Sequence, residues 1–157
     1  MPDLSSPSYR DVLGRFATGV VVVTTVDGEG PIGVTCQSFV ALSLDPPLVS
    51  FAMTSTGASW TRMKGSSHFA ISVLAADQAE LATQFATSGI DKFAGVAMSH
   101  SALDDPLIDG ALAHVEVEVV DVATYGDHDL VVARVVNLGA FEGEPVLFFR
   151  GSFRHLQ

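Results

Sequence analysis

Residues 18–51 read TGVVVVTTVDGEGPIGVTCQSFVALSLDPPLVSF, and this stretch decides the fold. Val20–Val26 is almost wholly β-branched, and the glycine-rich segment Asp27–Gly30 leads into Ile32–Leu42. β-Branched side chains favour strands, while Gly and Asp favour tight turns, so the stretch predicts a β-hairpin. After a break at two prolines, Leu48–Met53 is apolar and too short for a helix, which predicts a third strand.

Periodicity and turn residues predict the other elements outward from this stretch. The expected strands are Phe69–Leu74, His114–Val119, Leu130–Leu138 and Val146–Phe149. The expected helices are one that begins at Ser8 and ends before Thr18 and Gly19, one over Asp77–Phe85 capped by Asp77, and a helical turn at Ser59–Met63. The connections are hairpins rather than βαβ units, and the segment Ala86–Gly110 is a long irregular loop. We therefore expect a mainly β protein of about seven strands and two or three short helices, an antiparallel barrel with helices at its rim.

Length and composition indicate one domain over residues 1–157 and restrict the partners. The chain is 48% hydrophobic and 17% charged, which favours burial of leftover apolar surface in a homodimer. A formal net charge of -10 argues against nucleic acid but not against a small anionic cofactor. Cys36 is the one cysteine, and the five histidines lack metal-ligand spacing, so we expect no disulfide and no metal. No leader or membrane segment is evident, which predicts a cytoplasmic protein without membrane contact.

Polar side chains are unusually dense within the apolar strands of residues 18–39. They are Thr18, Thr24, Thr25, Thr35, Gln37 and Ser38. Buried polar groups need partners, which either neighbouring strands or a polar ligand can supply. Composition alone leaves both readings open.

The quoted stretch resembles the opening half of the flavin reductase-like, split-barrel family, whose members bind FMN or FAD. Four later features follow in the family's order: FAISVLAADQAELATQFA from Phe69, KFAG from Lys92, PLIDGALAHVEVEV from Pro106 and GDHDLVVARV from Gly126. The resemblance covers nearly the whole chain. It implies an antiparallel, Greek-key split barrel that transfers a hydride from NADH or NADPH to FMN or FAD.

The resemblance also implies a flavin site. The residues that it assigns to the flavin ring and ribityl chain are Thr18, Gly19, Val20, Thr35, Cys36, Gln37 and Ser38. Those assigned to the loop around the flavin phosphate are Met53, Thr54, Ser55, Ser59 and Trp60, and a family position near the flavin matches Lys92 and Phe93. Arg62 and Lys64 belong to the same loop and are either phosphate ligands or solvated charges.

His128 is the residue that the resemblance places against the nicotinamide. Its expected role is to orient the carboxamide rather than to supply a proton, although a turn histidine between two aspartates is also typical of a solvated side chain. The nicotinamide nucleotide is further expected at Phe149, Arg150, Gly151 and Ser152. Phenylalanines stand here where the family often has two tyrosines, so a phenolic hydrogen bond is lost.

Other chemistries are less well supported by the sequence. Cys36 has no resolving partner and no cation that would favour its thiolate, so it is better interpreted as a small apolar residue. His68 and His114 are interpreted as structural. No Gly-x-Ser-x-Gly motif, P-loop or Rossmann fingerprint occurs.

The leading hypothesis is a flavin reductase that supplies reduced flavin to a partner monooxygenase. A flavin-binding module for electron transfer or sensing, without its own nicotinamide-dependent activity, is the alternative. A split barrel for another ligand, such as a deazaflavin or haem, and a purely structural dimer are weaker alternatives.

Overall fold

Strand pairing in the computed structural model, which describes residues 1–157, produces three antiparallel sheets. The strands are β1 Thr18–Gly19, β2 Val21–Asp27, β3 Gly30–Cys36, β4 Val40–Ser43, β5 Leu48–Thr54, β6 His68–Val73, β7 Met98–His100, β8 Pro106–Ile108, β9 Ala113–Tyr125, β10 His128–Ala140, β11 Val146–Phe149 and β12 Ser152–His155. The helices are α1 Ser6–Leu13, α2 Ala58–Met63, the 3-10 helix η1 Ala76–Gln78 and α3 Ala79–Ala86.

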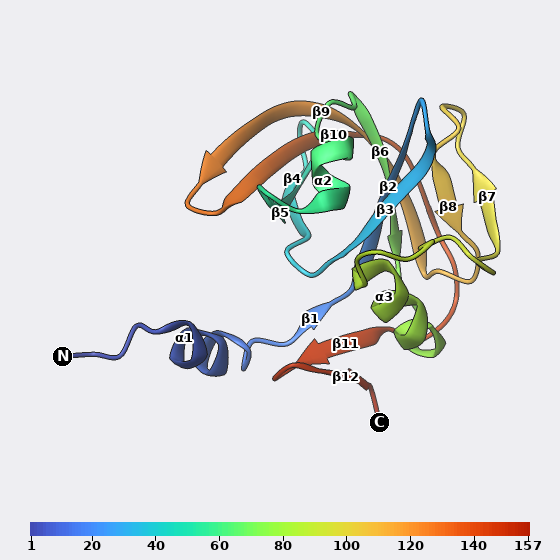
Figure 1. Ribbon diagram of the computed structural model, residues 1–157. Coiled ribbons are helices and arrows are strands. Elements are labelled where there is room, and N and C mark those ends of the chain that lie inside the picture. Colours follow the sequence, from blue (N-terminus) through green and yellow to red (C-terminus); the bar gives the residue numbers. More distant parts are fainter.

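The main sheet has seven strands in the order β3-β2-β6-β9-β10-β5-β4 (Figure 1). Every neighbouring pair in it is antiparallel. The end strands β3 and β4 do not pair with each other, so the barrel stays open between them. β1, β11 and β12 form a second sheet, and β7 with β8 forms a third. The predicted antiparallel split barrel is confirmed.

Two apolar cores explain why the start of β2 is so uniformly β-branched. Val21 and Val23 belong to the larger cluster inside the barrel, with Phe51 and Phe69. Val20 and Val22 belong to a second cluster on the other side of the strand, beneath α3, with residues such as Phe85. Because alternate residues of a strand face opposite sides, a strand buried on both sides needs apolar residues throughout.

One expected strand is interrupted in the structure. The predicted strand Ile32–Leu42 divides into β3 and β4 at Gln37–Phe39, and β4 pairs with β5 at the far end of the sheet. Ser38 explains the break, because its Oγ accepts a hydrogen bond from the Ala52 amide at 2.8 Å and donates to the Ala52 carbonyl at 2.9 Å. A side chain thus replaces ladder bonds where the chain crosses from β3 to β4.

The predicted helix ends were also wrong. α1 begins at Ser6, two residues before Ser8, and ends at Leu13. Thr18 and Gly19 form β1 and pair with β11 instead of stopping the helix. Asp77 lies within η1 and does not cap α3.

The twelve observed strands exceed the seven predicted because the additional ones are short. β1, β7, β8 and β12 have two to four residues each, and β4, which separates from the predicted strand Ile32–Leu42, has four. Such segments carry too little periodicity to be recognised in a sequence. The two long strands β9 and β10 were predicted as a pair, and they arch away from the barrel as one hairpin (Figure 1).

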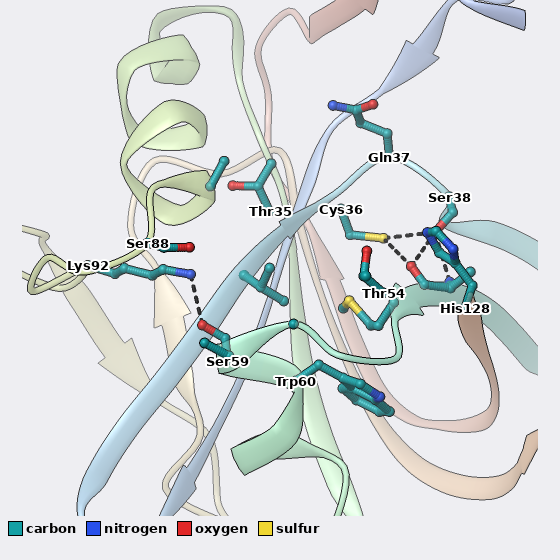
Figure 2. Close-up of a pocket in the computed structure, with 16 residues that line it drawn as sticks. Thr35, Cys36, Gln37, Ser38, Thr54, Ser59, Trp60, Ser88, Lys92 and His128 are labelled. Carbon is teal, nitrogen blue, oxygen red and sulfur yellow. Dashed lines mark hydrogen bonds between the residues drawn. The ribbon is translucent and has the colours of Figure 1, made fainter. Parts of the chain in front are cut away.

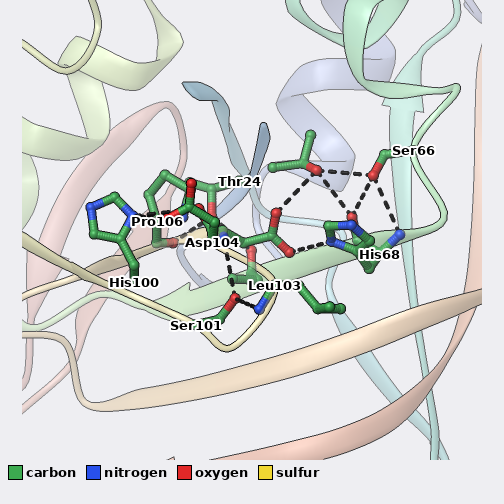
Figure 3. A network of polar contacts seen from close by, with 11 residues as sticks. Thr24, Ser66, His68, His100, Ser101, Leu103, Asp104 and Pro106 are labelled. Carbon is green, nitrogen blue, oxygen red and sulfur yellow. Dashed lines mark hydrogen bonds and ion pairs between the residues drawn. The ribbon is translucent and has the colours of Figure 1, made fainter. Parts of the chain in front are cut away.

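A polar network that includes Thr24, His68 and Pro106 connects the loop after α3 to the barrel (Figure 3). Buried Asp105 belongs to this network. Its carboxylate contacts His68 Nδ1 through Oδ2 and accepts a hydrogen bond from Thr25 Oγ1 at 3.2 Å. Burial raises the pKa of Asp105, while the contact with His68 opposes that shift. His114 Nε2 lies 2.8 Å from the Ile108 carbonyl oxygen. Both histidines therefore have the structural contacts expected of them.

The first helix contributes nothing to either core. α1 stands away from the barrel (Figure 1), and none of its residues is buried. Tyr9, Val12 and Leu13 are more than half exposed, as is Phe16 just beyond the helix. None of the helices has the length and apolar character needed to cross a membrane.

Candidate functional site

A cleft of about 390 Å³ lies beside the edge strand β3, between α2, α3 and the end of β5 (Figure 2). It collects most of the side chains singled out from the sequence. Those that line it are Thr35, Cys36, Gln37, Ser38, Met53, Thr54, Ser59, Trp60, Lys92 and His128. Predicted site residues from β3, β5 and α2, from the loops after β3 and α3, and from the start of β10 are therefore brought together in one place.

Backbone groups dominate the rim of this cleft. β3 is an end strand of its sheet, so the edge of β3 away from β2 has no strand partner. Gln37, Ser38 and Phe39 make no hydrogen bond to another backbone group. Gln37 and Ser38 are exposed and line the cleft, so their peptide groups are accessible to a polar ligand that enters it.

Several polar side chains of the site are already hydrogen-bonded within the protein. Thr35 Oγ1 donates to the Ala82 carbonyl of α3 at 2.6 Å. Ser38 Oγ is held by the two bonds to Ala52 and lies 3.1 Å from Cys36 Sγ. Burial raises the pKa of the Cys36 thiol, so this cysteine stays protonated at neutral pH. These side chains shape the wall of the cleft and leave ligand contacts to the backbone.

Asp129 organises the floor of the site beneath α2. Its Oδ2 accepts a hydrogen bond from Trp60 Nε1 at 2.7 Å, and its Oδ1 accepts from Ser55 Oγ at 2.9 Å and Thr124 Oγ1 at 2.8 Å. These hydrogen bonds lower the pKa of Asp129, and the bond from Trp60 has the largest effect. The carboxylate thus holds α2 and the turn before it against the β9–β10 hairpin, and the Ser55 hydroxyl is used for this purpose.

Lys92 is a cation without a carboxylate partner. Its Nζ donates to Ser59 Oγ at 2.8 Å and to the Gly33 carbonyl at 3.3 Å, and it forms no salt bridge. Burial lowers the pKa of Lys92. A half-buried ammonium with only neutral partners favours the approach of an anion.

The other two cations considered from the sequence are placed differently. Arg62 makes a two-pronged contact with Asp27, at 2.8 and 3.0 Å, and lies 3.5 Å from Glu29, so its charge is already compensated. Lys64 follows the last residue of α2 and does not line the cleft. Of the three, Lys92 is the one available to a ligand.

His128 occupies the other end of the cleft from Lys92 (Figure 2). It is the first residue of β10, and its Nδ1 lies 2.7 Å from Asp127 Oδ1. Hydrogen bonding to His128 lowers the pKa of Asp127. The His128 side chain is about half exposed, at 48%, so a second molecule can reach it.

Some predicted residues do not line this cleft. Thr18 and Gly19 line a neighbouring apolar hollow of about 520 Å³, which also includes Gln37 and Ser38. Thr18 Oγ1 is buried there without a hydrogen-bond partner. Val20 is fully buried in the second core and is not available to a ligand within this chain, because odd and even residues of this segment face opposite sides.

The remaining predicted residues do not line the cleft either. Phe93 faces a second cleft beyond Lys92, and Ser55 is turned toward Asp129. Phe149, Arg150, Gly151 and Ser152 form the turn between β11 and β12 and line neither cleft, and the Arg150 amide donates to the Gly14 carbonyl instead. The segment expected to bind the nicotinamide nucleotide therefore does not share a cleft with His128 within one chain.

Sequence reasoning missed two kinds of contributor. Small residues line the cleft without any chemical signature, among them Gly57, Ala58 and Ser88. Asp129 was overlooked although a signal existed, because an ionised residue at the start of a valine-rich strand must be paired if it is buried.

Comparison with known proteins agrees with this geometry. Residues 13–157 match the family model described as "Flavin reductase like domain". The reductase subunit HsaB of a flavin-dependent monooxygenase from Rhodococcus jostii is 41% identical over 150 residues, which are 95% of this chain and 77% of the relative. The FMN reductase (NADH) SmoA from Agrobacterium fabrum is 38% identical over 149 residues, which are 95% of this chain and 85% of the relative.

A solved structure extends the similarity to the whole fold. The crystal structure of a nitrilotriacetate monooxygenase component B homolog from Mycobacterium thermoresistibile superposes with a TM-score of 0.92 and 41% identity. The match covers 96% of this chain and 86% of that one.

Proposed function

Because the chain belongs to the flavin reductase-like family, we propose that it transfers a hydride from NADH or NADPH to FMN or FAD and supplies the reduced flavin to an oxygenase component. Relatives named as an NADH-dependent FMN reductase and as the reductase subunit of a monooxygenase support both parts of this proposal. They favour it over a flavin module without nicotinamide-dependent activity.

The observation that carries the proposal is the pairing of a free backbone edge with an uncompensated cation in one cleft. Flavin mononucleotide has a polar ring edge that forms hydrogen bonds and a terminal phosphate that carries negative charge. The exposed peptide groups of Gln37 and Ser38 fit the first feature, and Lys92 fits the second. A cleft of about 390 Å³ is within the usual size range for cofactor sites. The residues present therefore fit a flavin.

The chain's own residues have three tasks in this proposal. Lys92 and Ser59 would hold the phosphate, and the backbone of Gln37 and Ser38 would position the ring at the opposite end. When bound, the flavin accepts a hydride from the reduced nicotinamide and supplies the redox chemistry. His128, half exposed beside the ring end, orients the nicotinamide carboxamide through Nε2 while Asp127 holds Nδ1.

A steady-state matrix tests the function directly. The purified protein is mixed with NADH or NADPH and with FMN or FAD, and the absorbance of the reduced nicotinamide is followed. Turnover with at least one pair is expected. Flavin binding without nicotinamide oxidation by any pair would leave only the carrier function, and absence of flavin binding would remove both.

We also propose that the active species is a homodimer in the cytoplasm, without membrane or nucleic-acid contact. The support is an α1 helix with no buried residue and an expected nicotinamide segment that does not reach His128 within one chain. Light scattering should give a dimer mass, and Val12→Asp on the exposed face of α1 should shift it toward the monomer. Leu44→Asp, at a 94% exposed position outside α1, is the matched control and should leave the mass unchanged.

A further inference from the structure

The place of Lys92 in the cleft depends on the loop that carries it. Residues 87–97 lie between α3 and β7 and belong to no helix or strand. Around Lys92, backbone hydrogen bonds join only residues three apart, as from the Ala94 amide to the Asp91 carbonyl at 3.2 Å. Such short turns set the local shape of the loop, but they do not fix its position against the rest of the protein.

The side chain of Gln84 connects this loop to α3. Its Nε2 donates to the Lys92 carbonyl at 2.7 Å and to the Ala94 carbonyl at 3.0 Å. No backbone N–H donates to either carbonyl. Both N–H bonds of one amide are therefore used, and each meets a group that can only accept. Gln84 is half-buried on the last turn of α3, so this contact fastens the backbone of Lys92 to the helix.

The next residue of α3 holds a side chain of the same loop. The Phe85 ring is fully buried and contacts the Phe93 ring edge-to-face, with ring centroids 4.9 Å apart. Beyond this anchor, the Lys92 side chain extends to Ser59 Oγ of α2 at 2.8 Å (Figure 2). Lys92 is therefore held at its backbone by Gln84 of α3 and at its ammonium by α2.

We propose that Gln84 is a positioning residue for the flavin phosphate and acts on it only through Lys92. The inference rests on the proposed function, because that function places the phosphate at the Lys92 ammonium. Gln84 does not line the cleft, so it has no direct contact to offer the ligand. A lysine with a fixed backbone loses less freedom when its ammonium binds a phosphate, and this preorganisation increases affinity.

The test compares dissociation constants for riboflavin and FMN by quenching of flavin fluorescence. Gln84→Met removes both donors and keeps an unbranched side chain that favours a helix. It should weaken FMN about three- to tenfold and change riboflavin by less than about twofold. Thr83→Val is the matched control, because the Thr83 hydroxyl bonds to the Ala79 carbonyl within α3 at 3.3 Å, and it should alter neither affinity.

A double-mutant cycle shows whether Gln84 acts through Lys92. In the Lys92→Met background, Gln84→Met should change FMN affinity by less than about twofold, because the charge that the amide positions is already gone. A role of Gln84 in the general integrity of the fold would instead lower FMN affinity in both backgrounds. Gln84→Asn keeps the amide but is one methylene shorter, so it should weaken FMN selectively even if methionine disturbs the packing of α3.

Lys64 and Lys92 are the two lysines of the chain, which allows a measurement without flavin. Reductive methylation with ¹³C-labelled formaldehyde labels both side chains, and NMR titration follows the pKa of each. Burial lowers the pKa of Lys92, so release of the loop in Gln84→Met should raise this pKa toward its ordinary value. Lys64 is the internal reference, and its pKa should not change.

Four results would overturn the inference. They are an unchanged FMN affinity in Gln84→Met, equal losses of riboflavin and FMN affinity in that variant or in Thr83→Val, an equal effect of Gln84→Met with and without Lys92, and an unchanged pKa of Lys92 in Gln84→Met. Failure of the proposed function is distinguishable, since the wild type would then reduce no flavin with nicotinamide, while the pKa of Lys92 would still respond to Gln84→Met.

Discussion

Replacing Lys92 by methionine should weaken the binding of the flavin phosphate without affecting the binding of the flavin ring. Methionine keeps an unbranched stem of similar length and removes the ammonium. The variant therefore loses the Nζ contacts with Ser59 Oγ at 2.8 Å and with the Gly33 carbonyl at 3.3 Å, together with the one uncompensated positive charge of the cleft. FMN and FAD should bind more weakly, and riboflavin, which has no phosphate, should not.

The size of this effect follows from the surroundings of the ammonium. A hydrogen bond to a charged group contributes about 1.5–3 kcal/mol. A Coulomb interaction between unit charges about 4 Å apart near a protein surface is about 4 kcal/mol, which sets a ceiling. Lys92 is only half buried, so water screens part of this attraction, and we expect FMN to bind about 10- to 100-fold more weakly. Riboflavin affinity should change by less than about twofold.

Titration of flavin fluorescence measures both ligands, and Lys64→Met is the matched control. Lys64 lies just after the last residue of α2 and does not line the cleft, so its replacement should alter neither affinity. A urea unfolding curve for each variant shows whether the fold is retained. Equal losses for riboflavin and FMN in Lys92→Met would refute the phosphate role, and a loss of FMN affinity in Lys64→Met would show that the phosphate lies elsewhere.

Three further predictions concern the wall, the floor and the open end of the cleft. Gly33→Ala should lower the free energy of unfolding by about 1–3 kcal/mol in urea titrations, because the new Cβ would lie 2.8 Å from a ring carbon of fully buried Phe85. Gly28→Ala is the control, since its Cβ would meet nothing within 4 Å, and equal urea midpoints for the two variants would contradict the prediction. Hydrogen bonds hold the pKa of Asp129 in the folded state below its ordinary value of 3.8, so this carboxylate stabilises the fold fully above pH 3.8 and loses its effect as the pH falls through the folded pKa. Asp129→Asn should therefore be less stable than the wild type at neutral pH, and its stability should fall less steeply in acid when unfolding is followed by Trp60 fluorescence. Equal acid dependence of the two proteins would contradict this prediction. His128→Ala should raise the KM for NADH or lower kcat while flavin affinity stays within about twofold, and an equal loss of flavin binding would show that the imidazole holds flavin instead.

The elements that could be predicted from the sequence are those determined by local pattern. β2 and β3 follow from a β-branched run and a glycine-rich turn, and the long pair β9 and β10 follows from alternation around Gly126. The break between β3 and β4 could not be predicted, because it depends on hydrogen bonds between Ser38 and a residue fourteen positions away. The pairing of β1 with β11 joins segments more than a hundred residues apart, and local sequence periodicity does not indicate such a contact.

The location of the site was easier to predict than the role of each residue. The segment Thr35–Ser38 lines the cleft as expected, as do Trp60, Lys92 and His128. The assignment of Val20 to the flavin depends on which way a strand faces, and that of the Phe149–Ser152 segment to the nicotinamide nucleotide depends on the path of a remote hairpin. Neither property is contained in residue identity.

The polar side chains that first drew attention to this segment are not the ones left for a ligand. Thr35 and Ser38 form hydrogen bonds with backbone carbonyls or amides of neighbouring elements, and Trp60 with the Asp129 carboxylate. A hydroxyl or indole that is already hydrogen-bonded in this way gains little from a second partner, whereas an exposed peptide group can exchange its water for a ligand atom. The Ser38 side chain therefore holds the backbone of residues 37–39 in place, and in the proposed site the exposed peptide groups of Gln37 and Ser38 are the ones left to contact the flavin ring. Substitutions that keep the Ser38 contacts, such as Ser38→Thr, should accordingly preserve flavin affinity, and Ser38→Ala should reduce it through movement of the backbone against Ala52 rather than through loss of a direct contact.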